Sequence, residues 1–178
     1  MYFLEVYSNT KERDKMILRI ALREYKFICS FRKTSRVLGV ISRLNGDNNE
    51  HILMWDFDNK FIEDIALSLK IIQMRYFLSD IMILESNKEK QNYHAYCFTR
   101  TDWQKAVAIT ASTPNIDWDF VRLAVYRGNF TLRISQKLGN PEPNLVRILK
   151  GETLADCTPE DLISFVNYEI WRDKERIK

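Results

Sequence analysis

The chain has 178 residues, a hydrophobic fraction of 46% and an aromatic fraction of 12%, which is enough for one domain with a buried core. Its 27 basic and 24 acidic residues give a net charge of +3. This composition excludes a chain that is disordered over most of its length, and five glycines with four prolines exclude a collagen-like or linker-like chain. Expected helices and strands are mixed along the chain, so the sequence predicts an α+β (mixed α/β) fold.

The sequence also bears on where the protein is found. Every long apolar stretch is interrupted by charge before it reaches the length of a membrane span. The first residues lack the basic, apolar and small-residue order of a signal peptide. Cys29, Cys97 and Cys157 are widely spaced and form no CxxC pair, as is typical of idle or buried thiols in a reducing compartment. We therefore expect a soluble, intracellular protein of the cytoplasm.

Positive charge is concentrated near the N-terminus. Residues 11–43 contain ten basic and three acidic residues, a net charge of +7, so the remainder of the chain is net acidic. Such a stretch is either a surface that follows nucleic-acid phosphates or a solvated helix face. Tyr25, Phe27 and Phe31 are available there to stack on bases. The basic residues from which we expect nucleic-acid contacts are Arg23, Arg32, Lys33 and Arg36.

Apolar spacing and turn residues predict the secondary structure. In the first half we expect a helix over 16–27, strands over 37–41 and 51–55 with a turn at 45–47, a helix capped by Asn59 that ends near Tyr76, and a strand over 81–84. In the second half we expect a loop over 86–91, a strand over 93–98, a helix over 102–111 capped by Thr101, a hairpin of strands 121–126 and 130–135, and a helix from Thr158 to about Arg172. Residues 1–150 would form one core, and the helical appendage 151–178 would pack on it or dock a partner.

Asp56 and Asp58 stand two residues apart at the end of the expected strand 51–55, so their carboxylates share one side of it. Two adjacent carboxylates repel each other unless a cation lies between them, and hard oxygen ligands suit Mg²⁺ or Mn²⁺. The alternative is a strand end at which both acids are simply hydrated. The apolar run before the acids favours a central strand, and therefore a metal site.

Two further residues suit a nucleotide. His94, on an expected strand, can donate a hydrogen bond to a phosphate, although a histidine there can also be partly buried and satisfied within the protein. Arg133 lies in an apolar strand and needs an anionic partner, which is either a triphosphate or one of the aspartates. Lys137 follows it and adds a second positive charge.

Three short segments resemble, in order and spacing, motifs of the archaeo-eukaryotic primase superfamily, which includes the primase-polymerases. They are Trp55-Asp56-Phe57-Asp58, Asn92-Tyr93-His94, and residues 121–126 together with 130–139. The resemblance covers about two thirds of the chain, residues 32–150. It implies that the first motif binds metal, that the histidine of the second contacts the incoming nucleotide, and that the third supplies another acid and a basic strand.

The third motif departs from the family pattern, because Arg122 stands where the acid is expected. Asp117 or Asp119 would supply that acid in a shifted register. With this change, the resemblance implies a replication-associated DNA primase or polymerase that transfers nucleotides on a single-stranded template. Its implied metal ligands are Asp56, Asp58, Asp117 and Asp119, and its implied triphosphate ligands are His94, Arg133 and Lys137.

The resemblance also implies partners. These are single-stranded DNA or RNA, nucleoside triphosphates, and a helicase or other replication protein, as for a plasmid- or virus-encoded factor. One alternative is a catalytically inactive primase-like fold that binds nucleic acid or a replication partner, which Arg122 suggests. The other is a small interaction domain with no role in nucleic-acid chemistry.

Overall fold

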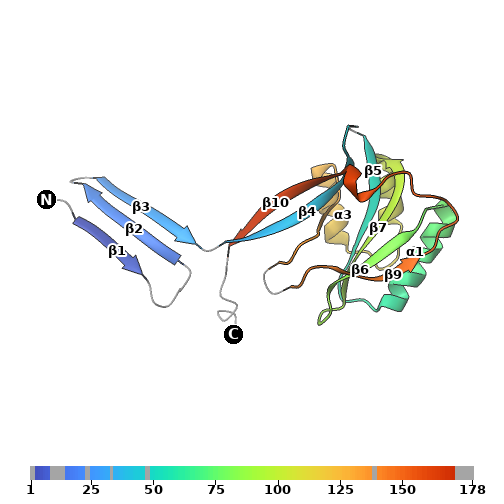
Figure 1. The fold of residues 1–178 in the computed structure, drawn as a ribbon, viewed down its shortest axis with the longest axis horizontal. Coiled ribbons are helices and arrows are strands. Elements are labelled where there is room, and N and C mark those ends of the chain that lie inside the picture. The colour runs from blue at the N-terminus through green and yellow to red at the C-terminus, as the bar shows by residue number, and fades with distance from the viewer. Residues whose placement is uncertain are drawn as a thin grey trace. The chain divides into compact units, whose positions relative to one another are not determined.

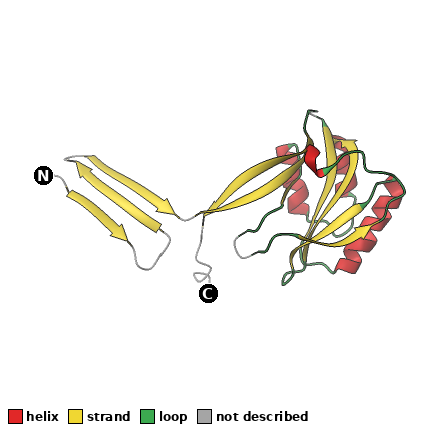
Figure 2. Cartoon of the chain, in the orientation of Figure 1, coloured by secondary structure: helices red, strands yellow, loops and turns green. Residues whose placement is uncertain are grey.

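The computed structural model describes residues 3–8, 15–22, 25–32, 34–46, 49–137 and 140–170 (Figure 1). Chain contacts divide the protein into two compact units. The smaller unit comprises Met1–Arg36 and Tyr168–Lys178, and the larger comprises Val37–Asn167. The fold is α+β, as the sequence predicts: α1, α2 and α3 all belong to the larger unit and accompany its sheet (Figure 2).

The smaller unit contains a three-stranded sheet in the order β1-β2-β3, formed by Phe3–Ser8, Lys15–Leu22 and Tyr25–Arg32. Both pairings are antiparallel, and β2 and β3 pair over their whole length, from Lys15 opposite Arg32 to Leu22 opposite Tyr25. The helix predicted over 16–27 is therefore wrong. Its apolar residues fit a helical stripe, but the run 16–18 is also continuously apolar, and cross-strand hydrogen bonds along eight residues decide in favour of a hairpin.

The larger sheet has seven strands in the order β10-β4-β5-β7-β6-β9, with β8 paired to β4 outside this path. The pairings β4–β5, β4–β8, β5–β7, β6–β7 and β6–β9 are antiparallel. The strands are β4 (Thr34–Leu44), β5 (Glu50–Phe57), β6 (Ile81–Asn87), β7 (Asn92–Asp102), β8 (Thr131–Arg133), β9 (Asn144–Leu149) and β10 (Leu162–Ile170). The strands predicted over 37–41, 51–55, 81–84 and 93–98 are confirmed, each within a longer strand.

The helices are α1 (Ile62–Tyr76), α2 (Trp103–Ala111) and α3 (Trp118–Arg127), with a 3₁₀ turn at Pro159–Asp161. Helix α1 ends where predicted, but its N-cap is Phe61 and not Asn59. Helix α2 is capped by Asp102, whose side chain accepts a hydrogen bond from the Lys105 amide, and not by Thr101. Within the part of the chain that the structure describes, no helix is long and apolar enough to cross a membrane.

Two further predicted elements, besides the helix over 16–27, have the wrong type. Residues 121–126, predicted as a strand, form the second half of α3, because Asp117 caps that helix and Gly128 ends it in a left-handed conformation at φ 73°. The predicted last helix starts correctly with a capping box of Thr158 and Asp161. It stops after one 3₁₀ turn, however, and residues 162–170 form β10. The strand predicted over 130–135 exists as β8, but its partner is β4.

The core lies against β5, β7 and their neighbours. Trp55 and Phe57 of β5 are fully buried, and the Trp55 indole Nε1 donates a 2.8 Å hydrogen bond to Thr113 Oγ1 at the end of α2. Phe130 is also fully buried, with its ring stacked on that of Phe120 from α3 at a centroid distance of 5.2 Å. This stacking anchors α3 to the sheet beside β5.

Along one edge of β5, hydrogen bonds come from α2 and from the start of α3 instead of from a neighbouring strand. Strand β4 meets β5 at Arg43 and His51, whereas its earlier residues pair with β8. Farther along β5, the Met54 carbonyl accepts a 3.4 Å hydrogen bond from Thr110 Oγ1, and the Asp56 carbonyl accepts one of 3.0 Å from the Asp117 amide. Buried strand carbonyls need such partners. The start of α3 is thereby held beside Asp56.

We expect Phe130→Ala to lower the free energy of unfolding by about 3–5 kcal/mol, because it removes a fully buried ring and leaves a cavity between α2, α3 and β8. Urea denaturation of the variant would measure this loss. Leu154→Ala, at a side chain that is 91% exposed, is the matched control and should change stability by less than about 0.5 kcal/mol. Equal effects of the two substitutions would contradict this placement of Phe130.

Candidate functional site

The structure brings together the first two candidate motifs. Asp56 of β5 lies directly opposite His94 of β7 in the antiparallel register. The distance between Asp56 Oδ1 and His94 Nε2 is 3.8 Å, and the two side chains are 25% and 7% exposed. Since cross-strand neighbours project from the same face of a sheet, both side chains belong to one site. This adjacency follows from the strand pairing, which the spacing of the motifs along the chain does not determine.

Burial controls the charge of both side chains. It is the largest cause that raises the pKa of Asp56, to about 7, and the negative charges of Asp58 and Asp117 raise it further. Burial also lowers the pKa of His94, to about 3, and the nearby Arg133 charge acts in the same direction. At neutral pH His94 is therefore uncharged, so its contact with Asp56 is not an ion pair.

Two buried polar atoms on this face of β7 lack partners. His94 Nδ1 and the hydroxyl of Tyr96, two residues farther along the strand, have no hydrogen-bond partner among the described residues. Burial raises the pKa of Tyr96, and so does the nearby charge of Asp56. Unpartnered buried polar groups are uncommon in folded proteins, and they often mark a place where water, an ion or a ligand binds.

Asp117 reaches the site as the N-cap of α3. Its amide donates to the Asp56 carbonyl, while its side-chain Oδ1 accepts a 2.9 Å hydrogen bond from the Asp119 amide. Asp58 is exposed at the end of the strand, and its pKa is raised first by partial burial and then by Asp117. Three carboxylates, those of Asp56, Asp58 and Asp117, thus lie close enough to raise the pKa of at least one neighbour.

These carboxylates do not form a closed ligand set. Within the described ranges of the chain, no group of three or more histidine, cysteine, aspartate or glutamate side chains is placed to hold a metal ion. Asp119 is largely engaged elsewhere, since its Oδ1 lies 3.2 Å from Arg122 Nη1 in an exposed ion pair. Asp56, Asp58 and Asp117, whose charges act on one another, are therefore the better candidates for binding a cation.

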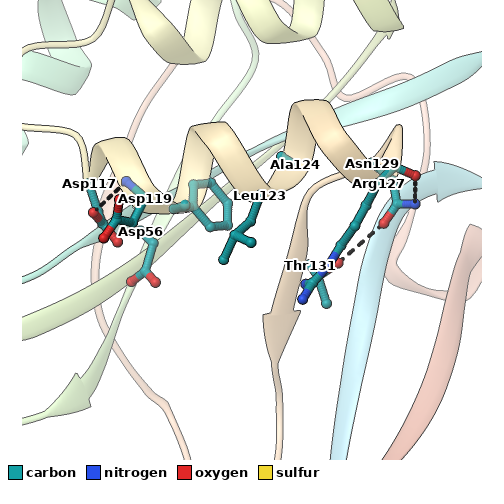
Figure 3. Close-up of a pocket in the computed structure, with 9 residues that line it drawn as sticks. Asp56, Asp117, Asp119, Leu123, Ala124, Arg127, Asn129 and Thr131 are labelled. Atoms are coloured by element: carbon teal, nitrogen blue, oxygen red, sulfur yellow. Dashed lines mark hydrogen bonds between the residues drawn. The ribbon is translucent and has the colours of Figure 1, made fainter.

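A hollow of about 200 Å³ opens beside Asp56 (Figure 3). Its floor and walls come from β5, α3, the turn after α3, and β8. The residues that line it are Asp56, Asp117, Asp119, Phe120, Leu123, Ala124, Arg127, Asn129 and Thr131. The sequence analysis does not identify the polar residues at the far end of the hollow, Arg127, Asn129 and Thr131, as site residues. The strand expected over 121–126 gives no indication of them, because it is α3 that positions Arg127.

Arg122 occupies a different environment from the one the third motif implies. It lies on α3 rather than on a strand, its side chain is 79% exposed, and it pairs with Asp119. It is not among the residues that line the hollow. Of the two acids offered in its place, Asp117 and Asp119, it is Asp117 whose amide bonds to the Asp56 carbonyl, at the start of a helix rather than of a strand.

Arg133, which is predicted to bind a triphosphate, is hydrogen-bonded to the backbone in this structure. Its guanidinium donates hydrogen bonds to the backbone carbonyls of Ser135, Pro141 and Ser86. These bonds hold the segment after β8 against the end of β6. Lys137 takes part in the same segment, where its backbone forms an isolated bridge with Asn140. Arg133 still acts on the site electrostatically, since its charge lowers the pKa of both Asp56 and His94.

The predicted nucleic-acid contacts fall in the smaller unit and at its edge. Arg36 is exposed in β4, and Arg32 is the last residue of β3. Arg23 and Lys33 lie outside the described residues. The proposed stacking residues Tyr25, Phe27 and Phe31 all belong to β3, opposite Leu22, Ile20 and Met16 of β2.

Comparison with known proteins adds no relative: no family model, no curated protein and no solved structure matches this chain.

The raised pKa of Asp56 predicts a pH-dependent stability. Between its ordinary value of 3.8 and about 7, the folded protein holds this proton more tightly than the unfolded chain does, so the free energy of unfolding falls as pH rises. Asp56→Asn removes the titrating group. We expect the variant to match the wild type near pH 4 and to be more stable by about 2–4 kcal/mol above pH 7.

Urea denaturation at several pH values would measure this difference. Leu154→Ala is the control, because it replaces an exposed side chain that carries no titrating group, and its stability difference from the wild type should not change with pH. A difference for Asp56→Asn that is constant from pH 4 to pH 8 would contradict the buried, repelled state of this carboxyl.

Proposed function

We propose that the protein is a primase- or polymerase-like nucleotidyltransferase that uses Mg²⁺ or Mn²⁺ and acts on a single-stranded template. The observation that carries the proposal is the direct cross-strand pairing of Asp56 with His94. The resemblance requires a metal-binding acid and a nucleotide-contacting histidine in one site, and these two motifs are 38 positions apart along the chain but adjacent in the sheet.

The electrostatics of the site support a cation. Asp56 and Asp58 both have raised pKa values, and the charge of Asp117 contributes to each. A divalent cation near these carboxylates would remove the repulsion and favour their ionised forms. In nucleotidyl transfer, such a cation would activate the attacking hydroxyl and stabilise the leaving pyrophosphate.

His94 would act in its neutral form. Its pKa of about 3 leaves one ring nitrogen as a donor and the other as an acceptor at pH 7. A neutral imidazole beside Asp56 can donate to a phosphate oxygen or orient the carboxylate, but it adds no positive charge. The positive charge needed by a triphosphate would therefore come from the cation and from arginine or lysine side chains.

Primer extension on single-stranded DNA with Mg²⁺ or Mn²⁺ tests the proposal. We expect Asp56→Ala and Asp117→Ala to lower incorporation by about 100-fold or more, because each weakens the cation site. Asp64→Ala, at an exposed acid in the first turn of α1, should leave incorporation unchanged and is the matched control. Absence of incorporation by the wild type with either metal would contradict the proposal.

A second candidate function is binding of single-stranded nucleic acid without catalysis. Two observations favour it: the described residues contain no three-ligand metal group, and residues 11–43 carry a net charge of +7. In that case the protein would bind single strands in a salt-dependent way and would incorporate no nucleotide.

Salt titration of single-stranded DNA binding tests the basic surface in either case. We expect Arg36→Ala to reduce the slope of log K against log salt by about 0.7, the value for one lost phosphate contact on a single strand. Lys105→Ala, at an exposed lysine on α2, should leave the slope unchanged and is the control. Equal slopes for all three proteins would show that Arg36 makes no phosphate contact.

A further inference from the structure

The hollow beside Asp56 has two chemically different ends (Figure 3). At one end are the carboxylates of Asp56, Asp117 and Asp119, below the start of α3. At the other end, Arg127 stretches from the last turn of α3 toward Thr131 of β8. The side chain of Leu123 lies between the two ends. The hollow is thus acidic at one end, apolar in the middle and basic at the other.

At the basic end, the side chains of Asn129 and Thr131 are hydrogen-bonded beside Arg127. The Asn129 side chain accepts a 3.2 Å hydrogen bond from the Thr131 hydroxyl and donates one of 3.2 Å to the Arg127 carbonyl. Among the described residues, the Arg127 guanidinium itself has no hydrogen-bond or ion-pair partner. A positive charge suits the last turn of a helix, but that explains the residue's position in α3 and not the direction of its side chain into the hollow.

Arg127 differs in this respect from the two other arginines near the site. The donors of Arg133 are held by backbone carbonyls, and Arg122, which does not line the hollow, pairs with Asp119. A planar guanidinium whose N–H groups have no other acceptor is the side chain best suited to bidentate hydrogen bonding with phosphate oxygens. The lining of the hollow therefore points to Arg127 as the arginine available to an anionic ligand.

We infer that Arg127, together with Asn129 and Thr131, binds the phosphate chain of a nucleoside triphosphate whose divalent cation is held at the Asp56 end of the hollow. This inference rests on the proposed function and assigns the contact with the triphosphate to α3 and β8. An anion alone would be repelled by the carboxylates across the hollow, so a cation at Asp56 is needed before the phosphates enter. Cation and triphosphate should accordingly bind cooperatively.

Equilibrium binding of a non-hydrolysable adenosine triphosphate analogue, with an α,β-methylene bridge, tests the inference in the presence of Mg²⁺. We expect Arg127→Ala to weaken binding by at least about tenfold and Arg127→Lys to weaken it less, because lysine keeps the charge but loses the forked geometry. Arg122→Ala is the matched control on the same helix and should change the affinity by less than about twofold. Thermal melts would verify that all variants fold.

The outcomes separate this inference from the proposed function. Wild-type affinity in Arg127→Ala overturns the assignment of Arg127 and leaves incorporation to be judged by primer extension. Binding that depends on Arg127 and on Mg²⁺, in a protein that incorporates no nucleotide, supports the inference and overturns nucleotidyl transfer. Failure of the wild type to bind the analogue at millimolar concentration overturns both.

Discussion

The site depends on how the backbone carbonyls along one edge of β5 obtain hydrogen-bond partners. Strand β4 pairs with β5 at His51 but with β8 before that, so the later carbonyls of β5 need other partners. The hydroxyl of Thr110 and the amide of Asp117 provide them, at Met54 and Asp56. Leaving such carbonyls buried without partners would cost about 1–3 kcal/mol each. The fold therefore requires the start of α3 to lie against the residue that carries the first acid.

At the start of α3, the preference for an aspartate at the N-cap conflicts with the repulsion between that aspartate and Asp56. A helix that starts beside Asp56 gains about 1 kcal/mol from an aspartate at its N-cap, and Asp117 supplies it through its bond with the Asp119 amide. The same aspartate adds negative charge next to a carboxyl whose pKa is already raised by burial to about 7. Serine or threonine would cap the helix without this repulsion. The choice of aspartate is more easily understood if a cation binds there, which supports the proposed metal chemistry.

The sequence predicts the central strands well, because the apolar runs of β5 and β7 are too short for a buried helix and are bounded by polar turns. It fails for α3 because Val121, Val125 and Tyr126 favour strands locally. The capping residues Asp117 and Gly128 on either side outweigh that preference, and packing of Phe120 on Phe130 fixes the helix. The error concealed Arg127, since a strand over 121–126 gives no indication that Arg127 lines the same hollow as Asp56.

Arg133 is a separate case, because the strand predicted around it exists as β8 and only its partners differ from the expected ones. From the sequence, Arg133 in an apolar strand needs an anion, and neither the hydrogen-bonding capacity of Ser86 nor that of Pro141 is visible as a partner. Only the folded structure brings Arg133 of β8 to the carbonyls of Pro141 and of Ser86 in β6. For Arg133 to bind a triphosphate, it would have to release bonds that hold this segment. Its contribution to the site is therefore electrostatic: its fixed charge opposes protonation of both Asp56 and His94, and so favours an ionised carboxylate and a neutral imidazole.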